Sequence, residues 1–336
     1  MNKYSLLAVL LVLFLDTRAQ MPKGLEMNEY EKAKTFIIKD LDKDSYVKFD
    51  NNAYVLDRYE GQKPYFITGD DGLKKRIDLY SLFSRATSST IGTIIYYTNE
   101  KGKMYTACLP NVSADPKVWE KYFEDIHATD KEEKFYVLKL SYVLSKALSY
   151  QQYRSTLKGN EPDRAEAGTY GNDICFPGDE EVTMADGNKK MLSDIKPGDR
   201  VITVNPETHR PAVVNVKGLT VHDAKNYAIT TLTLVSVKEK VSDAGNEVLL
   251  LSRQLEATPN HPVMTRSGIN HMGTVSEGEE VLCKNTKTGK YEAYTVWDKQ
   301  ERAKGIQKVY NIDADGGSTF IINGVMVMQK QFDLNK

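Results

Sequence analysis

The chain has 336 residues, with 45 Lys and Arg against 46 Asp and Glu and a formal net charge of −1. This length suits about two domains, and the balanced charge argues against a general nucleic-acid-binding chain, which carries a basic excess. A hydrophobic share of 40% argues against a disordered chain. A mean hydropathy of −0.48, with one short apolar run, argues against a multi-span membrane protein.

The first 19 residues have the layout of a secretory signal peptide. Lys3 is positively charged, and Leu6 to Leu15 is an unbroken apolar run of ten residues. Thr17 and Ala19 are the small residues expected before a cleavage site at Gln20. The run is shorter than the roughly 20 residues of a membrane-spanning helix. We therefore expect export and a secreted or periplasmic mature protein.

Residues 20–157 are expected to form an α+β domain. A helix is predicted over 28–41 and one or two helices over 118–157, because apolar residues recur there every three to four positions. Between them, apolar and aromatic runs flank Asn, Asp and Gly turns, which predicts three β-hairpins. The paired runs are 45–50 with 53–59, 65–68 with 73–79, and 91–98 with 103–109. No catalytic constellation and no ligand site is recognisable in this domain.

Residues 158–174 are polar and contain no periodic pattern, which indicates a linker. The region from 175 to 336 is predicted to be all-β. Its expected strands are 181–184, 189–191, 201–204, 213–221, 228–237, 247–251, 281–284 and 309–312. Asp186-Gly187 and Asn323-Gly324 are strong signals for short turns.

An internal repeat runs through this second region. Each copy has a glycine, two apolar residues, a glycine followed by an acid, and a further apolar residue. The copies are Gly187, Met191, Ile195, Gly198, Asp199 and Val201, and Gly268, Met272, Val275, Gly278, Glu279 and Val281. The second copy starts 81 residues after the first and needs one gap. A duplicated β unit with pseudo-twofold symmetry is predicted.

Three motifs in the second region occur in a fixed order. Cys175 opens it, and Thr258-Pro259-Asn260-His261 follows 83 residues later. The end reads Val309-Tyr310-Asn311-Ile312 and then Phe320-Ile321-Ile322-Asn323-Gly324-Val325. Together with the repeat, these motifs resemble the Hint family, the self-processing module shared by Hedgehog proteins and inteins. The resemblance covers about the last half of the chain.

The resemblance implies cleavage of the chain's own backbone at Ile174–Cys175. The Cys175 sulfur would attack the Ile174 carbonyl in an N-to-S acyl shift, and the first domain would be the substrate. A thiol is mostly protonated at neutral pH, so the site needs a proton acceptor or relay. His261 is expected to exchange protons near its reference pKa of about 6.5. The Thr258 hydroxyl is expected to hold the scissile amide by a hydrogen bond. The sequence does not identify the donors to the oxyanion.

Two features set the expected outcome of this chemistry. Asp223 lies about where Hedgehog-type members keep an acid that activates the second nucleophile, although a solvated loop residue explains it as well. Inteins end in His-Asn, whereas Val325-Met326-Val327 is here followed by Met328-Gln329. We therefore expect single-turnover cleavage without splicing. The acceptor would be water, a small thiol or an amine, and neither a cofactor nor a metal is expected.

Several alternatives stay open at the level of the sequence. The Hint fold can be an inactive scaffold in a secreted binding or envelope protein. Cys175 can be a buried apolar residue or a disulfide partner of Cys108 or Cys283. A zinc site built from His261, His271 and Cys283 is conceivable but lacks the usual ligand spacing.

Overall fold

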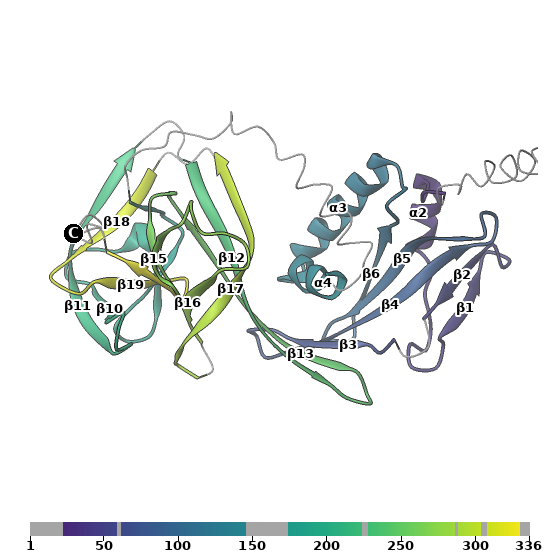
Figure 1. Cartoon of the computed structure of the whole chain (residues 1–336), viewed down its shortest axis with the longest axis horizontal. Coiled ribbons are helices and arrows are strands. Elements are labelled where there is room, and N and C mark those ends of the chain that lie inside the picture. The colour runs from purple at the N-terminus through teal and green to yellow at the C-terminus, as the bar shows by residue number, and fades with distance from the viewer. Residues whose placement is uncertain are drawn as a thin grey trace, which may run out of the picture. The chain divides into compact units, whose positions relative to one another are not determined.

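A computed structural model of the chain describes residues 23–58, 62–145, 174–223, 228–285, 288–303 and 308–329 (Figure 1). The chain divides into two compact units. The first comprises Met1–Ile67, Lys74–Asn160 and Lys240–Glu247, and the second comprises Thr68–Leu73, Glu161–Glu239 and Val248–Lys336. The predicted signal peptide at 1–19 and residues 158–173 of the predicted linker lie outside the described residues.

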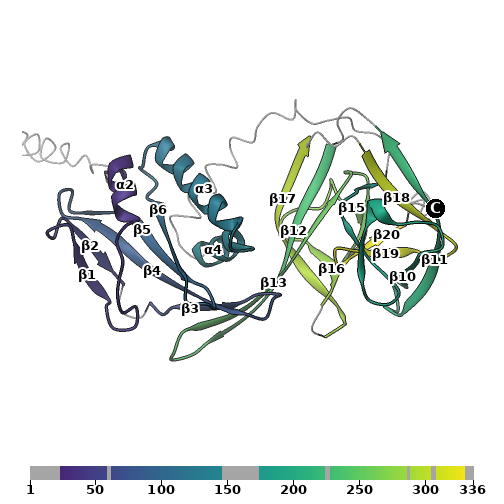
Figure 2. The same cartoon turned by 180° about the vertical axis from the view of Figure 1, so that it is seen from behind.

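Among its described residues, the first unit combines antiparallel strands with three helices, as the sequence predicts. The helices are α2 (Met27–Ala33), α3 (Pro116–Asp130) and α4 (Tyr136–Leu144). The strands are β1 (Tyr46–Phe49), β2 (Tyr54–Asp57), β3 (Tyr65–Thr68), β4 (Lys74–Ser84), β5 (Ser89–Thr98) and β6 (Met104–Pro110). β4 pairs with β2 and β5, and β6 pairs with the other edge of β5. Figures 1 and 2 show α3 and α4 lying over one face of these strands.

The helix predicted over 28–41 is shorter than expected. α2 ends at Ala33, and the chain then runs on without helical structure. This irregular stretch buries Phe36 and Ile38, and the Phe36 carbonyl accepts a hydrogen bond from the Tyr96 hydroxyl at 2.8 Å. Tertiary burial of apolar side chains therefore outweighs the local helical pattern. Further along, Phe135 has a φ of 60° and separates α3 from α4.

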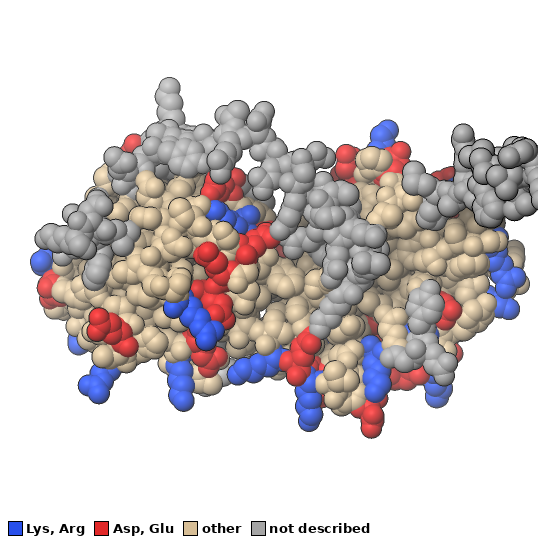
Figure 3. Space-filling model, in the orientation of Figure 1, with Lys and Arg blue, Asp and Glu red and all other residues tan. Residues whose placement is uncertain are grey.

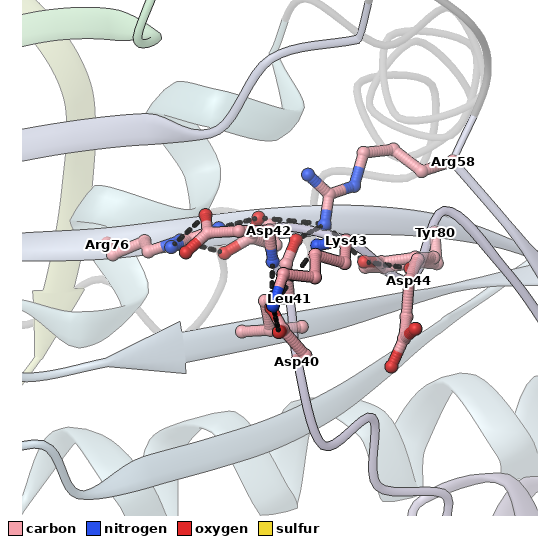
Figure 4. Close-up of polar contacts among 9 residues, drawn as sticks. Asp40, Leu41, Asp42, Lys43, Asp44, Arg58, Arg76 and Tyr80 are labelled. Atoms are coloured by element: carbon pink, nitrogen blue, oxygen red, sulfur yellow. Dashed lines mark hydrogen bonds and ion pairs between the residues drawn. The ribbon is translucent and has the colours of Figure 1, made fainter.

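A charged network joins the turn at residues 40–44 to β4 (Figure 4). Asp78 is 1% exposed and accepts from Arg76 Nε at 2.7 Å and Nη2 at 3.0 Å. Arg76 Nη1 also lies 2.8 Å from an Asp42 carboxylate oxygen. Arg58 donates to the Leu41 carbonyl and the Tyr80 hydroxyl. Because the buried Asp78 carboxylate is paired with Arg76 and hydrogen-bonded, its charge is compensated. The contacts of Arg76 and Arg58 also hold the turn at residues 40–44 in place.

The second unit is all-β apart from a short 3₁₀ turn, η3 (Leu192–Asp194), among its described residues. Its strands are β7 (Phe176–Pro177), β8 (Glu181–Thr183), β9 (Lys189–Met191), β10 (Arg200–Val204), β11 (Pro211–Asp223), β12 (Ala228–Val241), β13 (Asn246–Ala257), β14 (Pro262–Thr265), β15 (Gly268–His271), β16 (Glu280–Lys284), β17 (Tyr291–Ala303), β18 (Lys308–Ala314), β19 (Thr319–Ile322) and β20 (Val325–Met328). The tips of β12 and β13, at residues 240–247, group with the first unit.

Two strand sets enclose the apolar core of the second unit. One runs in the order β13-β12-β17-β16-β14-β20-β19-β8-β9, with β15 beside β14, and the other in the order β10-β11-β18-β7. The core between them includes Phe176, Leu232, Leu255 and Phe320, each at most 2% exposed. Six strands were not among those expected from the sequence: β7, β14, β15, β17, β19 and β20.

The structure confirms the internal repeat by matching backbone hydrogen bonds. Gly198 N donates to Val216 O at 2.9 Å, and Val216 N donates to Asp199 O at 2.8 Å. In the second copy, Gly278 N donates to Val296 O at 2.9 Å, and Val296 N donates to Glu279 O at 2.8 Å. Both glycines have a left-handed φ, 89° and 88°, which glycine adopts without steric cost. The same turn therefore precedes β10 and β16.

Acidic and basic side chains are interspersed on the face drawn in Figure 3, in keeping with the near-zero net charge. Among the described residues, no helix combines the length and the apolar character needed to span a membrane.

Candidate active site

Cys175 lies at the start of the second unit, directly before β7. It is 0% exposed and packs against Ile229 of β12 and Val309 of β18. All three cysteines are among the described residues, and each is present as a thiol, so Cys175 forms no disulfide with Cys108 or Cys283. The thiol is therefore chemically intact and shielded from solvent by apolar side chains.

Thr258 contacts Cys175 through both its side chain and its backbone. The Cys175 N–H donates to Thr258 Oγ1 at 3.0 Å. The Thr258 N–H donates to Cys175 O at 2.9 Å, and the Thr258 hydroxyl lies 3.3 Å from the same oxygen. Thr258 follows β13 and begins a turn that closes when His261 N donates to Thr258 O at 2.9 Å. The turn thus places the hydroxyl within hydrogen-bonding distance of the nitrogen of the Ile174–Cys175 peptide bond.

His261 lies in the interior beside the residue that follows Cys175. Its ring centroid is 4.0 Å from that of Phe176, and it is 0% exposed. Both ring nitrogens are shielded from solvent, and no hydrogen bond of normal geometry reaches them from the described residues. Burial lowers the pKa of His261 to about 3, while the Met328 backbone favours the charged form and His271 opposes it. The imidazole is therefore neutral near pH 7, and its pKa is far below the reference value assumed from the sequence.

Asn311 is a site residue that the sequence reasoning missed. It lies on β18, is 2% exposed, and its Nδ2 donates to Ile174 O at 2.7 Å. This oxygen belongs to the carbonyl that Cys175 would attack. The available signal was an asparagine inside an otherwise apolar strand pattern, because asparagine is depleted in strands. The sequence motif Val309-Tyr310-Asn311-Ile312 contains this position but implies no role for it.

Asp223 lies apart from the Cys175–Thr258 pair. It is the last residue of β11, is exposed, and pairs in register with Lys308. Thr220 of the same strand pairs with Asn311. Three residues of strand correspond to about 10 Å, and side chains an odd number of residues apart point to opposite faces. The role of Asp223 in activating an acceptor stays a prediction.

Two of the three residues weighed as zinc ligands, His271 and Cys283, have other contacts. His271 Nδ1 lies 2.8 Å from Asn260 O, and the Cys283 thiol lies 3.7 Å from Val281 O. Burial raises the pKa of the Cys283 thiol, which keeps it protonated. The described residues contain no group of three or more His, Cys, Asp or Glu side chains placed to hold a metal ion.

The end of β20 lies beside the same region of the fold. Val327 pairs with Val263, two residues after His261. Met328 and Gln329 follow where inteins have His-Asn. Gln329 is 4% exposed, its N–H donates to Ser318 O at 2.9 Å, and its Nε2 donates to Gly316 O at 3.0 Å. The Gln329 side chain is therefore engaged in structural contacts.

The second unit is similar to known proteins over most of its length. Residues 162–316 match the family model of the Hint module. A bacterial intein-like domain from Clostridium thermocellum is 22% identical, with a TM-score of 0.36, and the match covers 47% of this chain and 99% of that one. A DnaB intein from Synechocystis sp. PCC 6803 is 16% identical, with a TM-score of 0.35, covering 46% of this chain and 97% of that one. No curated protein matches the chain.

The C-terminal part of the chain, over residues 162–316, thus matches the Hint module. Apart from residues 240–247, the α+β unit lies outside the matched residues.

Proposed function

We propose that the Hint module cleaves its own chain at Ile174–Cys175 and releases the preceding α+β domain. The observation that carries the proposal is the hydrogen bond from the Cys175 N–H to Thr258 Oγ1, 3.0 Å long and shielded from solvent. It fixes the nitrogen of the bond to be broken beside an intact thiol. The module acts once on its own chain, so it is a self-processing protein rather than a turnover enzyme.

The first step is an N-to-S acyl shift that balances within the chain. A bond forms between Cys175 Sγ and the Ile174 carbonyl carbon, and the carbonyl electron pair moves onto oxygen. Collapse of this intermediate breaks the carbon–nitrogen bond. The proton lost by the thiol finishes on the Cys175 nitrogen, so the peptide and the thioester are isomers. The backbone contacts of Thr258 keep Cys175 in place throughout.

The neutral imidazole of His261 serves this step without carrying a stable charge. A neutral imidazole has one donor and one acceptor nitrogen. Since burial lowers its pKa to about 3, an imidazolium would be short-lived in this pocket. We propose that His261 relays the proton between sulfur and nitrogen rather than storing it.

Release needs an acceptor that attacks the thioester carbonyl. With water, the products are a first domain ending in the Ile174 carboxylate and a Hint module beginning with the Cys175 amine and thiol. A small thiol or an amine would leave a thioester or an amide on Ile174 instead. Because Met328-Gln329 replaces His-Asn, splicing is not part of the proposal. We also propose that residues 1–19 direct export and that the released domain acts outside the cytoplasm.

Intact-mass spectrometry of the purified full chain tests the proposal. With hydroxylamine or a small thiol present, the wild-type chain is expected to yield two fragments divided between Ile174 and Cys175. The Cys175→Ala chain is expected to stay whole. Cys283→Ala is the matched control, because it removes another thiol with 0% exposure from the same unit and keeps the nucleophile.

A wild-type chain that stays whole under every thiol condition would contradict self-cleavage. It would favour the alternative in which the Hint fold is an inert scaffold of a secreted binding protein.

A further inference from the structure

The hydrogen bond between Asn311 and Ile174 O points to a role that the motifs do not assign. Asn311 Nδ2 lies 2.7 Å from the oxygen, and the side chain is 2% exposed. An amide donor at this distance makes a strong contact, and the Asn311 side chain that supplies it is itself buried. The acceptor is the oxygen on which negative charge would develop during attack by Cys175.

The position of Asn311 is fixed by strands on both sides. β18 pairs with β11, where Asn311 is opposite Thr220. On its other edge, β18 pairs with β7, where Tyr310 is opposite Phe176. Asn311 is the next residue along this ladder, beside the junction of Ile174 and Cys175. A donor held in a sheet needs little reorganisation when charge appears on its partner.

We propose that Asn311 is a catalytic residue that stabilises the oxyanion formed on Ile174 O during the acyl shift. This inference rests on the proposed self-cleavage at Ile174–Cys175. As the sulfur–carbon bond forms, the carbonyl electron pair moves onto the oxygen that Asn311 already contacts. When the carbon–nitrogen bond breaks, the pair returns and the carbonyl is restored. Asn311 gains and loses no proton.

A carboxamide suits this role better than a carboxylate. Its Nδ2 donates at any pH, whereas an ionised aspartate has only acceptor oxygens. A carboxylate next to Ile174 O would repel the developing charge. The side-chain type at position 311 therefore sets the rate through hydrogen bonding and charge, and these two effects can be separated by substitution.

Cleavage rates of three full-length variants test the proposal. Asn311→Ala is expected to slow thioester formation about 100- to 1000-fold, the usual effect of removing one oxyanion donor. Asn285→Ala is the matched control, because Asn285 is similarly buried, at 3% exposed, and its Nδ2 donates to Glu292 at 2.9 Å, away from the site. It is expected to cleave like the wild type. Circular dichroism checks that all variants are folded.

The Asn311→Asp chain distinguishes a hydrogen-bond donor from a merely structural side chain. Only a protonated aspartate can donate to Ile174 O. Its rate relative to wild type is therefore expected to rise as pH falls from 7.5 to 5. The relative rate of Asn311→Ala is expected to stay flat. An Asn311→Ala chain that cleaves within about threefold of wild type would overturn the role of Asn311 and leave the proposed function standing.

A second measurement does not depend on cleavage. In the Cys175→Ala chain, isoleucine is labelled with carbon-13 at its carbonyl and alanine with nitrogen-15. Only the peptide bond between residues 174 and 175 then carries both labels, because the natural sequence has no isoleucine followed by alanine. Adding Asn311→Ala is expected to move that carbonyl resonance upfield as the hydrogen bond is lost. An unchanged resonance would overturn the inference. If the wild type fails to cleave, the proposed function and the catalytic role of Asn311 both fall, and the resonance still reports whether the contact exists.

Discussion

The buried neutral His261 makes the stability of the Hint module depend on pH in a defined window. In the folded chain, burial lowers the pKa of His261 to about 3. In the unfolded chain the imidazole is exposed to water and returns to a pKa of about 6.5. Between these values the unfolded state binds a proton that the folded state does not bind.

The sign and size of the effect follow from proton linkage. Where the unfolded state binds more protons, the free energy of unfolding rises with pH by about 1.4 kcal/mol per unit. The contribution of His261 is therefore fully present above pH 6.5 and is lost as pH falls toward about 3. The whole window corresponds to about 5 kcal/mol, and the part between pH 6.5 and 4.5 to about 3 kcal/mol.

Urea unfolding of the full chain measures this contribution. Cys175→Ala removes the proposed nucleophile and with it the proposed cleavage. Trp119→Phe leaves Trp297 of β17 as the single fluorescent tryptophan, so the signal reports the second unit. The same chain with His261→Gln keeps a polar side chain of similar reach that does not titrate. Carboxylates contribute equally to both chains, and their contribution cancels in the comparison.

We expect the difference in unfolding free energy between the two chains to change by about 3 kcal/mol from pH 6.5 to 4.5, with the histidine chain losing more. Between pH 7 and 8 the difference is expected to be constant. Parallel curves over the acidic range would show that His261 is protonated in the folded state or exposed to solvent. The relay role proposed for a neutral imidazole would then be wrong.

Three further outcomes are expected. Thr258→Val removes the acceptor of the Cys175 N–H and is expected to slow cleavage at least about 100-fold, whereas Thr258→Ser keeps the hydroxyl and should recover most of the rate in the same mass-spectrometric assay. Gly198 and Gly278 occupy equivalent turns with φ of 89° and 88°, and a new Cβ would meet open space at either position. Gly198→Ala and Gly278→Ala should therefore each lower the free energy of unfolding by about 1–2 kcal/mol. Unequal losses in urea unfolding would argue against equivalent turns. Leu255→Ala removes a core side chain of 0% exposure and should cost about 2–5 kcal/mol, which a loss under 1 kcal/mol would contradict.

Local sequence signals determined most short-range structure. Asp186-Gly187 and Asn323-Gly324 predicted tight turns, and the structure has positive φ at Gly187, Asn323 and Gly324. The repeat was readable because a glycine in a left-handed turn is required at the same place in both copies. The Thr-x-x-His motif was readable because its four residues form one closed turn.

Longer elements were not predicted where contacts with strands or side chains distant in the sequence stabilise them. β17 spans Tyr291–Ala303 and carries several charged residues, so its sequence lacks a clean alternation. It is a strand because β12 pairs along one edge and β16 along the other. The helix predicted to reach residue 41 ends at Ala33 for a related reason, since Phe36 and Ile38 beyond it are buried outside a helix.

The sequence by itself determined which residue types form the junction: a cysteine after a linker, a threonine and a histidine in one turn. Only the tertiary structure decided how they act. Asn311 reaches Ile174 O across 137 residues because of the strand order β11-β18-β7, which no local pattern encodes. The low pKa of His261 comes from packing beneath Phe176 rather than from its neighbours in the chain, because desolvation depends on what surrounds a group in space.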